Sequence, residues 1–95
     1  MTDQAIYWSS LYDHYNSLLT DKQKELFEDY YFDNLTLQEI ADNNDISRNA
    51  VHKTLNIITK KLEIYEEKLK YYKKTEKIKE LIKDEKLLNT VLEIL

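Results

Sequence analysis

The stretch that decides the fold is "TLQEIADNNDISRNAVHKTL", residues 36–55. Its first part has Leu37 and Ile40 at helical spacing, which predicts a short amphipathic helix. A four-residue break, "NNDI" at residues 43–46, follows this helix, and a second helix is expected to begin at Ser47. Two helices joined by so short a turn predict a helix-turn-helix.

The turn lacks glycine, the residue that most often adopts the left-handed backbone needed between two helices. Asn44 and Asp45 are the next most tolerant residue types, because their short side chains can form local hydrogen bonds. We expect Ile46 to plug the turn and the hydroxyl of Ser47 to cap the following helix.

The whole chain of 95 residues contains neither glycine nor proline. Since sheets depend on turn residues more than helices do, this composition predicts an all-α fold. Thr20 with Gln23, and Thr36 with Glu39, form capping-box patterns at two further helix starts. The expected layout is a single helical domain over residues 1–95, with a helix-turn-helix core at about 20–62, a long helix at about 47–73 and a C-terminal helical tail at about 76–95.

An apolar seam runs along the long helix in alternating steps of four and three residues, the spacing of a heptad repeat. Its members are Val51, Leu55, Ile58, Leu62, Tyr65, Leu69 and Tyr72. A second stripe at sevenfold spacing, Ile57, Ile64 and Tyr71, broadens the apolar face. The seam fits either a homodimer through the long helix or packing against the first and last helices of the same chain. For so long a helix in so small a protein we favour the homodimer.

Charge is unevenly distributed along the chain. Residues 1–46 hold ten acids and two lysines, a balance of −8, and residues 47–95 hold eight acids, eleven lysines and one arginine, a balance of +4. The two balances sum to the net charge of −4. Residues 47–62, "SRNAVHKTLNIITKKL", contain four basic residues, one histidine and no acid. This local basic strip matters more to an electrostatic partner than the acidic total does.

Sequence features of catalysis are weak. His14 and His52 have no metal ligand at a recognised spacing, there is no cysteine, and a phosphate-binding glycine loop needs glycine. We therefore predict no enzymatic activity, no cofactor and no metal site. The chain shows no signal-peptide pattern and no run of the ~20 apolar residues needed to cross a membrane. We expect a cytoplasmic protein without membrane insertion.

The long helix carries residue types that read DNA. In a helix-turn-helix the second helix lies in the major groove, with its N-terminal side chains at the base edges. The outward positions at that end are Arg48, Asn49, His52 and Lys53. Arginine can form paired hydrogen bonds with guanine, and asparagine can do so with adenine. The candidates for phosphate contacts, which position the protein without reading sequence, are Thr36, Gln38, Ser47 and Lys60.

Each of these residues also has a purely structural interpretation. Arg48 and Asn49 fit the solvated side of an amphipathic helix, and Ser47 caps its helix with or without DNA. Lys60 is close enough in sequence to Glu63 for an ion pair. A helix-turn-helix can also keep its shape and serve protein contacts instead. RNA ranks below DNA as a partner, because the sequence shows no aromatic platform for single strands.

Five segments between Leu11 and Tyr72 carry a family resemblance. They are "LYDHY" (residues 11–15), "LLTDKQ" (18–23), "YYFDNLTLQEIA" (30–41), "ISRNAV" (46–51) and "LEIYEEKL" (62–69). These segments resemble the bacterial YlxM family, small DNA-binding proteins with a helix-turn-helix like region 4 of sigma factors. The chain departs from the family pattern at Asp45, which stands where the turn usually has glycine, at a cost of about 1 kcal/mol.

The resemblance implies no enzymatic activity and a regulatory role in the signal recognition particle pathway. Our first hypothesis is a dimeric DNA-binding regulator of that pathway. The alternative is an adaptor that does not bind DNA and docks on a component of the signal recognition particle. Such an adaptor would use the long helix or the acidic N-terminal half.

Overall fold

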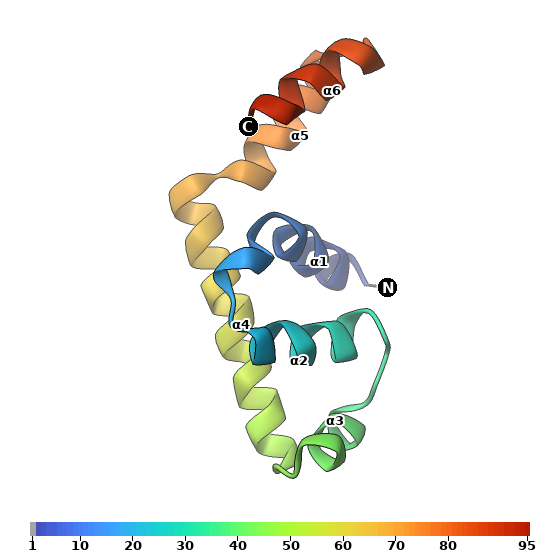
Figure 1. Ribbon diagram of the computed structural model, residues 1–95, viewed down its shortest axis with the longest axis vertical. Coiled ribbons are helices and arrows are strands. Elements are labelled where there is room, and N and C mark those ends of the chain that lie inside the picture. Colours follow the sequence, from blue (N-terminus) through green and yellow to red (C-terminus); the bar gives the residue numbers. More distant parts are fainter. Residues whose placement is uncertain (1) are drawn as a thin grey trace.

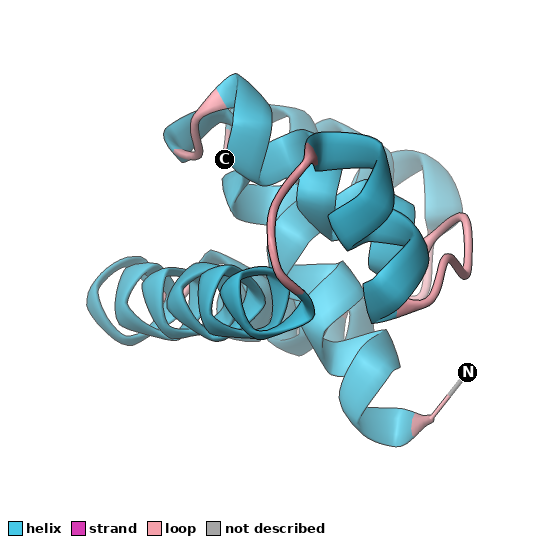
Figure 2. Cartoon of the chain, turned by 90° about the horizontal axis from the view of Figure 1, so that it is seen from below, coloured by secondary structure: helices cyan, strands magenta, loops and turns pink. Residues whose placement is uncertain are grey.

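The computed structural model of the protein describes residues 2–95, and its regular elements are all helical (Figure 1). They are α1 (Asp3–Tyr15), a 3-10 helix η1 (Asn16–Leu18), α2 (Asp21–Tyr31), α3 (Leu37–Asn44), α4 (Arg48–Leu69), α5 (Tyr71–Leu81) and α6 (Glu85–Ile94). Short loops join them, and no strand occurs in the described range (Figure 2). The all-α prediction is confirmed, with the helix-turn-helix at α3 and α4.

Helix α4 is the axis on which the other elements are arranged. It forms the long rod of Figure 1, and α1, α2 and α3 lie across one side of it. The α5–α6 hairpin continues beyond the end of α4, so the molecule is elongated, with extents of 48 × 24 × 21 Å. The first part of the chain thus forms a compact head on α4, and the last part forms an arm whose first helix, α5, contacts α1.

The hydrophobic core lies between α4 and the three helices that cross it. Its aromatic centre is the pair Tyr12 and Phe27, whose rings are stacked with centroids 4.3 Å apart. Burial of such large side chains is the main favourable term for a helical head of this size. The buried hydrophobic residues are Trp8, Leu11, Tyr12, Tyr15, Leu19, Leu26, Phe27, Ile40, Ala41, Val51, Leu55, Ile58 and Leu62.

The first four members of the heptad seam are buried inside their own chain, whereas Leu69, at the end of α4, is 41% exposed. Val51, Leu55, Ile58 and Leu62 all belong to the core, and they face α1, α2 and α3. The prediction that this seam forms a homodimer interface is therefore wrong. The alternative was that the seam packs against the first and last helices of its own chain. It holds for the first helix, α1, but not for the last helix, α6, because α6 packs on α5. The physical reason is that α1, α2 and α3 are short and need the apolar face of α4 to bury their own.

The second apolar stripe of α4 does not contribute to the core. Ile57 is 46% exposed and Ile64 is 48% exposed, and Tyr71 lies beyond the end of the helix. The apolar face of α4 is therefore broader than the part of it that the core covers. The buried face of α4 is as narrow as the seam itself, and the opposite face is open.

The long helix ends at Leu69, and the prediction that it continues to Lys73 is wrong. Lys70 has the left-handed backbone conformation, with φ 56° and ψ 30°, which interrupts the helix. The carboxylate of Glu66 accepts hydrogen bonds from the backbone N–H groups of Tyr72 and Lys73, both at 3.0 Å. This carboxylate caps the N-terminus of α5, which begins five residues earlier than the predicted tail.

Candidate nucleic-acid interface

The turn between α3 and α4 has the predicted backbone at Asp45, with φ 55° and ψ 40° in the left-handed region. The backbone N–H of Ile46 donates to the carbonyl of Ala41 at 3.1 Å and closes the end of α3. The Ser47 hydroxyl accepts from the N–H of Ala50 at 3.0 Å, so the predicted cap is confirmed. The prediction that Ile46 plugs the turn is wrong. Its side chain is 41% exposed, because backbone hydrogen bonds close the turn without help from that side chain.

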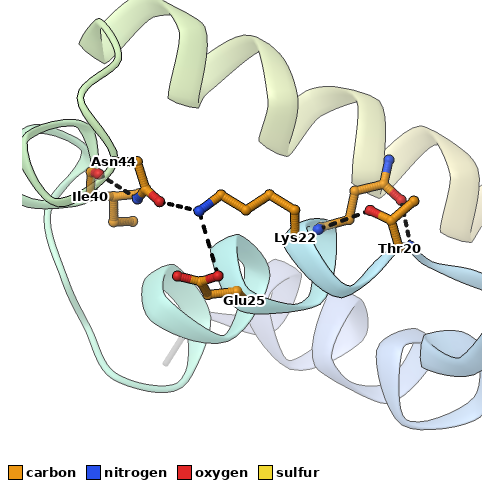
Figure 3. Close-up of polar contacts among 6 residues, drawn as sticks. Thr20, Lys22, Glu25, Ile40 and Asn44 are labelled. Carbon is orange, nitrogen blue, oxygen red and sulfur yellow. Dashed lines mark hydrogen bonds and ion pairs between the residues drawn. The ribbon is translucent and has the colours of Figure 1, made fainter.

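Polar contacts from α2 hold both helices of the motif in place. The Lys22 ammonium group donates to Asn44 Oδ1 at the end of α3 and lies 3.5 Å from Glu25 Oε2 (Figure 3). Asn44 Nδ2 in turn donates to the carbonyl of Ile40 at 2.7 Å. On α4, Lys61 Nζ donates at 3.2 Å to Oε1 of Gln23, the residue that also completes the Thr20 capping box.

The four residues predicted to read bases lie on the open side of α4. Arg48, Asn49, His52 and Lys53 are all exposed. Val51 and Leu55 point into the core, so the helical period places Asn49 and Lys53 opposite them. His52 lies at the side, and Arg48, three residues before Val51, is exposed in the first turn of the helix. No chain segment in the described range covers them.

A groove of about 830 Å³ runs beside this part of α4. Of the predicted site residues, it brings together Thr36, Gln38, Arg48 and His52. The other four, Ser47, Asn49, Lys53 and Lys60, are exposed but do not line it. One wall belongs to the start of α1, whose position could not be deduced from the sequence of the motif alone.

The groove contains two residues of α4 that the sequence reading missed, Asn56 and Thr59. Asn56 continues the four-residue spacing of Arg48 and His52, so these three side chains share one face of the helix. Extending that spacing by one turn would have identified Asn56. Tyr31, which also lines the groove, has its pKa raised by burial and then by Tyr30.

The candidates for phosphate contacts differ in what they can still donate. The hydroxyl oxygens of Thr36 and Ser47 accept helix N–H groups, which leaves both hydroxyl hydrogens free. Gln38 is less suitable, because its Nε2 donates to Asp42 Oδ1 at 2.8 Å. That contact occupies a donor of Gln38 and places a carboxylate beside it.

The first turn of α4 is unusual in its charge. The first turns of α1, α2, α3 and α6 each contain an acid, which suits the positive end of a helix. The first turns of α4 and α5 contain none, but the Glu66 carboxylate caps α5, whereas α4 begins with Arg48 and is capped by the neutral Ser47 hydroxyl. Within residues 2–95 the ion pairs are Lys22–Glu25 and Lys79–Glu76, so Arg48, Lys53 and Lys60 are unpaired. A helix start with uncompensated cations attracts an anion.

In the described part of the chain, no group of three or more His, Cys, Asp or Glu side chains is placed to bind a metal ion. None of the helices described between residues 2 and 95 is long and apolar enough to cross a membrane.

Comparison with known proteins identifies the family. A family model described as "Putative helix-turn-helix protein, YlxM / p13 like" (UPF0122) matches residues 2–93. A UPF0122 protein of Caldanaerobacter subterraneus is 46% identical over 86% of this chain and 76% of its own length, and one of Malacoplasma penetrans is 46% identical over 90% and 82%. A third, from Bacillus pumilus, is 48% identical over 77% and 66%. The chain therefore belongs to the UPF0122 family of YlxM/p13-like helix-turn-helix proteins.

Proposed function

We propose that this protein binds duplex DNA through α3 and α4 and acts as a regulator. The N-terminal half of α4 enters the major groove, and the start of α3 lies against the phosphate backbone, as in a sigma factor region 4. The observation that carries the proposal is the uncompensated start of α4, where exposed, unpaired cations lie at the positive end of a helix.

The roles of the reading residues follow from their positions on α4. Arg48 and Asn49, in the first turn, contact base edges at the tip, with guanine and adenine as their preferred partners. His52 and Lys53 lie one turn further along and reach the neighbouring base pair or its phosphate. Asn56 joins this set because it lines the same groove as Arg48 and His52.

The phosphate contacts come from both helices of the motif. Thr36 and Ser47 donate their free hydroxyl hydrogens, and the N–H groups at the start of α3 add further donors. Lys60 contributes charge three turns along α4. Gln38 contributes little, because its amide is bound to Asp42.

Electrostatics predict weak and salt-sensitive binding by a single copy. The basic strip neutralises only a few phosphates, and the chain has a net charge of −4 with its acids concentrated in residues 1–46. Two linked copies would bind two half-sites and gain affinity without new contacts. We therefore include self-association in the proposed function, through a surface other than the buried seam.

The family resemblance extends the proposal to genes of the signal recognition particle pathway as the regulated targets. The test is a selection from random duplex DNA at moderate salt, with the wild type and the Arg48→Ala, Lys53→Ala double variant in parallel. Enrichment of a defined sequence by the wild type alone supports the proposal. Absence of any enriched sequence, together with capture of a purified signal recognition particle component, would replace it with the adaptor role.

A further inference from the structure

Helix α6 has an apolar face that the rest of the chain leaves largely uncovered. None of its side chains is buried, although Leu87, Leu88, Val91, Leu92, Ile94 and the following Leu95 are all apolar. Ile94 is 80% exposed and Leu87 is 54% exposed. A ten-residue helix is marginal in water unless its apolar face is buried, so this face calls for a covering partner.

The apolar face has two edges with different surroundings. Leu92 and Leu95 line a hollow with His14 of α1 and Tyr71 of α5, so that edge faces the protein's own chain. Leu87, Val91 and Ile94 form the other edge, in steps of four and three residues. This is the spacing with which one helix packs against another.

We propose that the outer edge, Leu87, Val91 and Ile94, binds α6 of a second copy in an antiparallel pair. With the two-fold axis near Val91, Leu87 of each copy faces Ile94 of the other, and the two hairpins form a four-helix arrangement. Leu81, which is 70% exposed at the same end of the hairpin as Leu87, lies at the margin of this surface. This pair would be the surface through which the self-association in the proposed function occurs, and it does not depend on DNA binding.

Charge complementarity identifies the occupant as a second copy in the antiparallel direction. Lys86 and Glu93 are seven residues apart on one side of the outer edge, at opposite ends of α6. Both are exposed, and neither forms an ion pair within the described residues. An antiparallel pair brings Lys86 of each copy to Glu93 of the other, which gives two attractive contacts. A parallel two-fold pair would place the two copies of each residue on opposite sides of the interface and would form neither contact.

The exposed stripe on α4 is less suitable for self-association. It consists of Ile57 and Ile64, with Lys60 beside it at mid-length and Lys53 near its start. An antiparallel pair of α4 helices brings the two copies of Lys60 together. A parallel pair brings together the two copies of Lys60 and also the two copies of Lys53. Like charges in contact oppose such a dimer.

Sedimentation velocity over a concentration series, without DNA, tests the inference. We expect the wild type to dimerise, and the Leu87→Glu, Ile94→Glu variant to dimerise at least about a hundredfold more weakly. Because both side chains are exposed in the single chain, its helical content should be unchanged by circular dichroism. The matched control is Ile57→Glu, which should dimerise as the wild type does.

A charge exchange tests the antiparallel geometry. Lys86→Glu and Glu93→Lys should each weaken the dimer about tenfold, because each places like charges at both contacts. An equimolar mixture of these two variants should restore wild-type affinity, since the mixed pair has opposite charges at both contacts. A wild type that stays monomeric, a Leu87→Glu, Ile94→Glu variant that dimerises normally, or a mixture with no gain would each overturn the inference. A failure to bind DNA would leave it intact.

Discussion

The hydroxyl of Tyr15 on α1 donates a 2.5 Å hydrogen bond to Glu66 Oε1 near the end of α4. The same hydroxyl accepts a hydrogen bond from the backbone N–H of Tyr71, at 2.9 Å, where α5 begins. One buried side chain of the head thus joins the two helices on either side of the break at Lys70. This contact sets the direction in which the α5–α6 arm leaves the head.

Replacing Tyr15 by phenylalanine should lower the free energy of unfolding by about 1–3 kcal/mol. The change leaves the N–H of Tyr71 without its acceptor and removes one donor from the Glu66 carboxylate. Urea denaturation measures the loss. Tyr71→Phe is the control, because the Tyr71 ring is 40% exposed and should change stability by less than about 0.5 kcal/mol. Equal stabilities for Tyr15→Phe and the wild type would contradict this role.

Alkaline pH should destabilise the wild type partly through the same residue. Burial, followed by the hydrogen bond to Glu66, raises the pKa of Tyr15 to about 12 from its ordinary value of 10.0. Because the folded-state pKa is the higher one, the stabilisation is complete below pH 10 and is lost as the pH rises through about 12. Urea midpoints of the wild type and Tyr15→Phe should therefore converge as the pH rises across this interval. A constant difference between them would count against the raised pKa.

A charge at Val51 should unfold the head, whereas a charge on the open face of α4 should not. Val51 is fully buried in the core, so Val51→Asp is expected to cost several kcal/mol. Ile57 is 46% exposed on the same helix, and Ile57→Asp should cost less than about 1 kcal/mol. Thermal melts of the two variants compare the faces directly. If Val51→Asp melts like the wild type, the buried face has been assigned wrongly.

Glycine at position 45 should stabilise the protein. Asp45 has φ 55°, a conformation in which any Cβ is strained and glycine is not. Asp45→Gly is expected to raise the free energy of unfolding by about 0.5–1 kcal/mol, and Asp45→Val should lower it by at least as much. Chemical denaturation of both variants tests the sign. A destabilised glycine variant would mean that the Asp45 side chain has a further role.

The sequence predicted the seam of α4 correctly but not its partner. The spacing of Val51, Leu55 and Ile58 requires that this face be buried, yet a heptad spacing is the same for a helix of the same chain and for one of a second copy. The choice depended on how much apolar surface α1, α2 and α3 present together, which is a property of the assembled head. The break at Lys70 escaped prediction for a related reason, since contacts from Tyr15 and Glu66 cause it and no local breaker residue marks it.

The candidate site was more predictable than the helix boundaries. The exposure of Lys53 follows from the helical period once Val51 is placed inside, whereas Arg48 shares the side of Val51 and is exposed in the first turn of α4. The groove beside Arg48 could not be predicted, because one of its walls comes from α1, a helix outside the motif. The contact between Gln38 and Asp42, four residues apart on α3, was visible in the sequence as an alternative to a phosphate contact.

DNA affinity as a function of salt tests the central claim most directly. Fluorescence anisotropy with a labelled duplex should give a logarithm of affinity that falls linearly with the logarithm of salt concentration for the wild type. The Arg48→Ala, Lys53→Ala variant should bind far more weakly and should retain its helical content. The slope of its logarithm of affinity against the logarithm of salt concentration should be smaller in magnitude by up to about two. The matched control is Lys77→Ala with Lys83→Ala, which removes the same charge from exposed positions near the other end of the molecule. Wild-type binding by the first variant, or an equal loss in the control, would contradict recognition through α4.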